Sequence, residues 1–95
     1  MEELLCRYDS RQSFYGKAFV ETTKNTYELT QDLYSYGTLV ASIITNFEDR
    51  KIKYIYNGKY SQTTTRHQKE FFKQNGLSDK EIKELFKNME LVKEV

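Results

Sequence analysis

The chain has 95 residues, which is enough for one compact domain but too few for two separate cores without disulfides or metal sites. Fifteen basic and fourteen acidic residues leave a net charge of +1, so no overall field favours nucleic acid or an acidic membrane surface. One cysteine excludes an internal disulfide, no apolar run approaches the roughly 20 residues that span a bilayer, and the first residues lack the pattern of a signal peptide. We therefore expect a single cytoplasmic domain, residues 1–95, with no membrane segment.

The first half of the chain has the alternating pattern of β-strands. Residues 14–21 place apolar side chains on one side and charged ones on the other, and they predict the first strand. Residues 22–25 predict a turn in which Asn25 takes a left-handed conformation, and Tyr27 begins a second strand that completes a hairpin.

Two interruptions shape the next strands. Gln31 and Asp32 break the pattern of the second strand and predict a bulge, a small loop or a bend, and Gly37 then marks a turn. Residues 38–47 include the run from Leu39 to Ile44, in which only Ser42 is polar, and this run predicts a strand that is covered on both faces.

The following strand places Ile52, Tyr54 and Tyr56 on one face and lysines on the other. Asn57 and Gly58 are the residues that type I′ hairpin turns favour, so residues 59–61 are expected to form a short return strand.

From Thr63 onward the period becomes helical. Thr65 and Gln68 fit a capping box, and Gly76 fits the left-handed residue that ends a helix. Ser78 and Glu81 form a second capping box before a second amphipathic helix. The order of elements predicts an α+β fold, with a mostly antiparallel sheet of four to five strands followed by two C-terminal helices packed on one face.

Residues 60–67 (YSQTTTRH) are the densest polar group in the sequence and contain the only histidine, His67. A catalytic interpretation would use His67 as the acid or base with Ser61 or Thr64 as the nucleophile. Hydroxyl side chains at a helix start are also what capping requires, so a structural role is favoured and the protein is expected not to be an enzyme. Cys6 and His67 are too few for a metal site, and the glycines form no phosphate-binding loop, so neither metal nor cofactor is expected.

A basic and aromatic cluster gives the sequence a second interpretation. Lysines and one arginine alternate with tyrosines between residues 51 and 73, a composition typical of single-stranded nucleic-acid binding. Lysines on alternate strand positions are also simply a solvated face, and Glu48, Asp49 and Glu70 dilute the positive charge. Nucleic-acid binding by this surface therefore stays an alternative.

Four segments together resemble a family of small proteins found in phages and mobile elements of Gram-positive bacteria, across Tyr15 to Gly76. They are residues 14–18 (FYGKA), 33–41 (LYSYGTLVA), 60–67 (YSQTTTRH) and 71–76 (FFKQNG). The resemblance implies an accessory protein that acts inside a bacterial cell, and such proteins often inhibit host defence, as anti-CRISPR proteins do.

The leading hypothesis is therefore a small non-enzymatic protein that binds and inhibits a host protein, such as a CRISPR effector. Tyrosine and arginine dominate interface hot spots, which makes the surface around residues 57–58 the expected contact. The candidate partner-binding residues are Tyr60, Arg66, Tyr54, Tyr56, Lys59 and His67. Tyr60 and Arg66 rank first, because Tyr54 and Tyr56 share a face with Ile52 and are expected to turn toward the helices.

Overall fold

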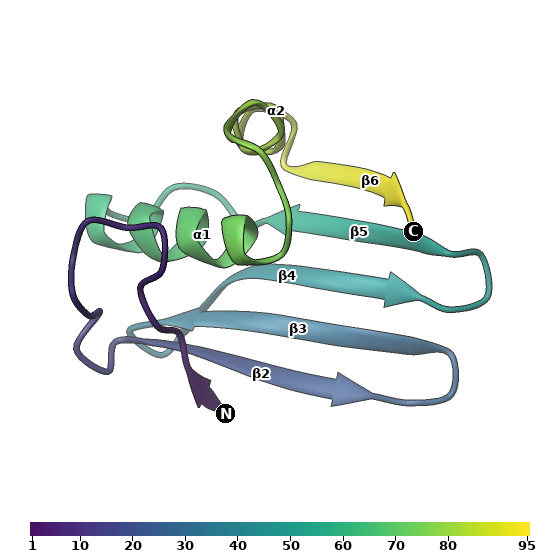
Figure 1. Ribbon diagram of the computed structural model, residues 1–95, viewed down its shortest axis with the longest axis horizontal. Helices are drawn as coiled ribbons and strands as arrows, with labels where there is room; N and C mark the ends of the chain where they lie inside the picture. Colours follow the sequence, from purple (N-terminus) through teal and green to yellow (C-terminus); the bar gives the residue numbers. More distant parts are fainter.

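Six antiparallel strands form one sheet, and two helices pack against it, in a computed structural model that describes all 95 residues (Figure 1). The order of the strands across the sheet is their order in the chain. The elements are β1 (Glu2–Glu3), β2 (Ala18–Lys24), β3 (Glu28–Ser35), β4 (Thr38–Asn46), β5 (Lys51–Tyr56), α1 (Gln62–Gln74), α2 (Asp79–Asn88) and β6 (Glu90–Glu94). The α+β class and the antiparallel sheet are thus confirmed, while the strands number six rather than four or five.

The first hairpin begins and ends later than its pattern predicts. β2 starts at Ala18 rather than at residue 14, because Tyr15 and Gly16 form a turn with positive φ angles of 52° and 69°. β2 then continues through the predicted turn to Lys24. Asn25 is not left-handed; its side-chain oxygen instead accepts hydrogen bonds from the backbone N–H groups of residues 27 and 28, and these bonds close the turn.

The predicted interruption at residues 31–32 is not observed, and the second hairpin has a bulge at another position. β3 runs unbroken through residues 31–32, and the register shifts one step later, where Leu33 faces Ala41 and Tyr34 faces Leu39. Val40 is the extra residue, on the partner strand. Residues 36 and 37 both have positive φ, as a two-residue type I′ turn requires, so the predicted turn at Gly37 is confirmed.

The prediction of a return strand at residues 59–61 is wrong, because the chain leaves the sheet after β5 and enters α1. β6 pairs with β5 instead, with Leu91 opposite Tyr54. Hydrogen bonds to distant residues fix the loop after β5 in a conformation that is not a hairpin turn. The N–H of Asn57 donates to the Val40 carbonyl, and the Gln68 side chain donates to the carbonyls of Val40 and Gly58.

The helix ends combine one wrong and two confirmed assignments. The N-cap of α1 is Ser61, whose hydroxyl accepts from the N–H of Thr64, so the predicted Thr65–Gln68 capping box does not form. At the other end, Gly76 is left-handed and residues 76 and 77 donate to the carbonyls of residues 73 and 72, the pattern of a Schellman motif. The Ser78–Glu81 capping box of α2 forms as predicted.

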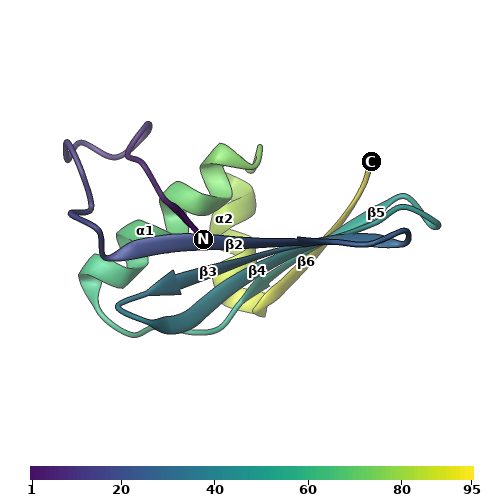
Figure 2. The same cartoon turned by 90° about the horizontal axis from the view of Figure 1, so that it is seen from below.

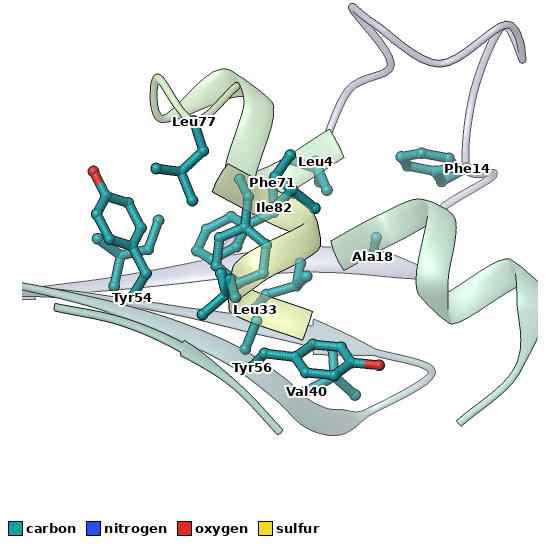
Figure 3. Close-up of a cluster of buried hydrophobic side chains, with 14 residues drawn as sticks. Leu4, Phe14, Ala18, Leu33, Val40, Tyr54, Tyr56, Phe71, Leu77 and Ile82 are labelled. Carbon is teal, nitrogen blue, oxygen red and sulfur yellow. The ribbon is translucent and has the colours of Figure 1, made fainter. Parts of the chain in front are cut away.

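The core lies between the helices and one face of the sheet. Figure 2 shows both helices on the same side of the sheet, and Figure 3 shows the buried side chains that meet there. The ring of Tyr56 stacks on Phe86 of α2 at 4.1 Å between centroids, and Tyr54 meets Phe72 of α1 edge-on. Coverage of β4 on both faces is not observed, since Leu39 and Ile44 lie on the side without helices and remain partly exposed.

Candidate functional site

His67 lies in the core and contacts three other parts of the chain. Its Nδ1 is hydrogen-bonded to the hydroxyl of Ser35 at 2.7 Å, and that hydroxyl is also bonded to Thr64. The rings of Phe14 and Tyr36 pack on the imidazole, with centroids at 4.4 and 5.8 Å. Burial lowers the pKa of His67 from its usual 6.5, which favours the neutral ring. These contacts join α1 to the β3–β4 turn and to the segment before β2.

The segment between β1 and β2 is fastened to α1 by polar contacts. Glu70 is 1% exposed, and one of its oxygens accepts the N–H groups of Tyr8 and Asp9 at 2.9 and 2.8 Å. Arg66 donates to the Asp9 carboxylate at 2.9 Å. Gln74 donates to the other Glu70 oxygen and to the Leu5 carbonyl. One face of α1 is therefore occupied in holding the N-terminal segment.

The candidate partner-binding residues fall into two groups. Tyr54 and Tyr56 are 3% and 6% exposed and lie in the core (Figure 3), and His67 is 1% exposed. Their side chains accordingly contribute almost nothing to the surface. Tyr60 is 51% exposed and Lys59 is also exposed, while Arg66 is partly exposed and paired with Asp9.

The basic and aromatic cluster of the sequence does not form one surface. Lys51 and Lys53 point to the side of the sheet without helices, because they alternate with the buried residues of β5. Lys69 and Lys73 lie on α1, on the other side of the sheet. Lys53 is also paired with Glu90 at 3.2 Å. The structure therefore divides the cluster between two sides of the molecule.

The side of the sheet without helices, here called the open face, carries a set of apolar side chains. The register places Phe19, Tyr34 and Leu39 side by side across β2, β3 and β4. Ile44, Ile55 and Val92 continue the set toward β6. All six are at least partly exposed, and Leu39 and Val92 reach 39% and 50%.

Polar groups frame and interrupt the open face. The hydroxyl of Ser42 donates to Asp32 at 2.6 Å near its middle, and the Lys53–Glu90 pair lies toward β6. An apolar patch with charged groups around it is typical of surfaces that contact other proteins. Sequence reasoning missed this site because residues 38–47 predicted a strand covered on both faces; the alternation of Phe19 and Tyr34 with buried neighbours was the available signal.

A family model, described as a family of unknown function (DUF8033), matches residues 3–88. The chain belongs to this family. The DUF8033 match runs from the second residue of β1 to the end of α2. It includes most of the open face, and His67 with the residues that contact it. No curated protein and no solved structure matches the chain. No helix of the structure combines the length and apolar character needed to cross a membrane.

Proposed function

We propose that this DUF8033 protein is a non-enzymatic binding protein that contacts a bacterial host protein through its open face and inhibits it. The observation that carries the proposal is the set of partly exposed apolar side chains that includes Phe19, Tyr34 and Leu39. In most sheets with one helical layer such a face is polar, since antiparallel sheets alternate apolar residues toward the core with polar residues toward water. Binding of a partner over these apolar side chains is favourable, because it removes apolar surface from water.

The setting of the proposal comes from the resemblance of residues 14–18, 33–41, 60–67 and 71–76 to proteins of phages and mobile elements. In that setting the host protein is a component of bacterial defence, and an inhibitor of a CRISPR effector is the most specific form of the idea. The protein then acts in the cytoplasm of the host cell.

A protein partner fits the open face better than single-stranded nucleic acid does. Binding of single strands uses exposed aromatic rings beside a basic track. Tyr54 and Tyr56, which the sequence offered as such rings, face the helices instead. The lysines of the open face are accompanied by Glu21, Glu90 and Glu94, so this face carries both signs of charge.

The test is capture of a partner from nuclease-treated host lysate, followed by binding and inhibition measurements with the purified partner. Leu39→Glu combined with Val92→Glu puts charges at the two most exposed apolar positions of the open face, and we expect it to weaken binding by about 2 kcal/mol or more. Tyr27→Glu is the matched control, because Tyr27 is 64% exposed in the β2–β3 turn. The control variant should bind and inhibit like the unmodified protein.

A second variant, Tyr60→Ala with Arg66→Ala, tests the surface that the sequence predicted. If this variant loses the partner while the open-face variant keeps it, the contact lies at the start of α1 and the open-face assignment is wrong.

The salt dependence of binding distinguishes a nucleic-acid partner from a protein partner. Phosphate contacts weaken steeply with salt, whereas binding through an apolar interface changes little.

A further inference from the structure

We propose that the groove between α1 and α2 binds an acidic, amphipathic segment of a protein. The groove is lined by residues of the second half of α1 and of α2; in Figure 1, α1 crosses the view and α2 is seen nearly end-on. Its volume is about 510 Å³, within the range of sites that hold a few side chains. The residues that line it are Lys69, Lys73, Asp79, Lys80, Ile82, Lys83 and Phe86. It lies on the helical side of the sheet and is therefore separate from the open face.

The charge of the groove is concentrated and only partly neutralised. Four lysines face one aspartate, although the whole chain has a net charge of only +1. Lys73 is paired with Asp79 at 3.0 Å across the helix junction. Lys69, Lys80 and Lys83 are exposed and make no ion pair. Three ammonium groups around one opening attract carboxylates.

The floor of the groove is apolar and held in place by the core. Phe86 is partly buried with its ring stacked on Tyr56, and it supplies most of this apolar surface, because Ile82 also lines the groove but is only 3% exposed. A ligand that matches both features carries apolar side chains with carboxylates on either side of them. An amphipathic helix with acidic flanks has this pattern, since residues at i, i+3 and i+4 lie on one face.

The same floor disfavours a polynucleotide. Single strands bind where several bases can stack on exposed aromatic rings. Phe86 is the only aromatic residue that lines the groove, and one face of its ring is already covered by Tyr56. A phosphate backbone would pair with the lysines but would leave the apolar floor without a partner.

The experiment uses the full chain and a fluorescein-labelled model peptide with leucines at helical spacing and glutamates flanking them, measured by fluorescence anisotropy at physiological salt. Lys69→Glu combined with Lys83→Glu should weaken binding of this peptide by about tenfold or more, because two attractive charges become repulsive. Lys17→Glu combined with Lys51→Glu is the control: both lysines are exposed, lie outside the groove and form no ion pair. It should bind within about twofold of the unmodified chain.

Three further arms decide the chemistry of the ligand. A peptide of the same composition with its leucines scrambled should bind more weakly, and amide chemical shifts should change mainly for residues 69–73 and 79–86. Equal binding of the scrambled peptide would overturn the role of the apolar floor. Equal or tighter binding of a single-stranded oligonucleotide of the same charge would overturn the choice of a protein segment. Loss of peptide binding in the open-face variant Leu39→Glu/Val92→Glu would place the site elsewhere, so this proposal and the proposed function fail separately.

Discussion

At the scale of single residues, His67 joins three parts of the chain that lie far apart in the sequence, through its contacts with Phe14, Ser35 and Tyr36. The sequence favoured a structural role for it and also offered it as a candidate partner-binding residue. In the structure the imidazole lies in the core, where it is hydrogen-bonded to Ser35 of β3 and packs on Phe14. No local pattern connects residues 14, 35 and 67, because their proximity is created by the packing of α1 on the sheet.

The lowered pKa of His67 makes stability depend on pH. The unfolded chain binds a proton near pH 6.5, before the buried ring does, so the free energy of unfolding should fall as pH drops through 6.5 toward the lower pKa of the folded state. Above pH 6.5 this contribution is fully present. Chemical denaturation of the unmodified chain and of His67→Gln at several pH values measures it.

His67→Gln should remove that pH dependence and lower stability by about 1–3 kcal/mol at neutral pH, because the buried Ser35 hydroxyl loses its imidazole partner. Partner binding should persist at temperatures where the variant is folded. Loss of inhibition by a fully folded variant would revive a direct role for His67, and an unchanged pH profile would show that His67 is not the titrating group.

At the scale of single elements, the junction between the helices gives the sharpest test. Gly76 has φ of 90°, and a Cβ built there meets no atom within 4 Å. Gly76→Ala should therefore cost about 1 kcal/mol from backbone strain alone, with no steric clash. Thermal unfolding of Gly76→Asn is the control, because asparagine tolerates the left-handed region and should cost less.

Ser78→Ala removes the N-cap of α2 and should lower stability by a similar amount, about 1 kcal/mol. Unchanged unfolding temperatures for both Gly76→Ala and Ser78→Ala would contradict the placement of this junction.

The predictions that succeeded depend on local signals. The Gly37 turn, the Gly76 terminus and the Ser78 capping box each involve residues within a few positions of one another. The return strand predicted after Gly58 does not form, because the position of that loop depends on distant residues. Asn57 donates to the Val40 carbonyl, and the Gln68 side chain donates to the Gly58 carbonyl. β6 was missed because Met89 continues the helical spacing, although its left-handed conformation ends α2. For the candidate site, the sequence predicted helices on one face of the sheet, but residues 38–47 predicted a strand covered on both faces, so the exposed apolar residues of the open face were not predicted.

At the scale of the whole molecule, β6 follows α2 directly and completes the sheet as the edge strand beside β5. Leu91 packs against the core, whereas its neighbour Val92 lies on the open face and is 50% exposed. Leu91→Ala should lower the free energy of unfolding by about 2 kcal/mol. Val92→Ala should change it by no more than about 0.5 kcal/mol, since little is lost at an exposed position.

Chemical denaturation of these two variants tests the pairing of β6 with β5. Equal effects of the two substitutions would mean that residues 90–94 do not form a strand with one face on the core. The same orientation of β6 is seen at Lys93. It lies on the same side of the strand as Leu91 and is paired with Glu81 of α2 at 3.0 Å.

The strand order also has a consequence for how the chain folds. From β3 to β5 every strand pairs with its immediate predecessor, so each of these pairings closes only a short loop. The contacts of Glu70 with Tyr8 and Asp9 join residues 62 and 61 positions apart, and they require α1 to be present. During synthesis, strands β2 to β5 can assemble as successive hairpins before α1 emerges, whereas Tyr8 and Asp9 must wait for α1. The segment between β1 and β2, although it precedes the sheet strands in the chain, is therefore among the last parts to reach its final position.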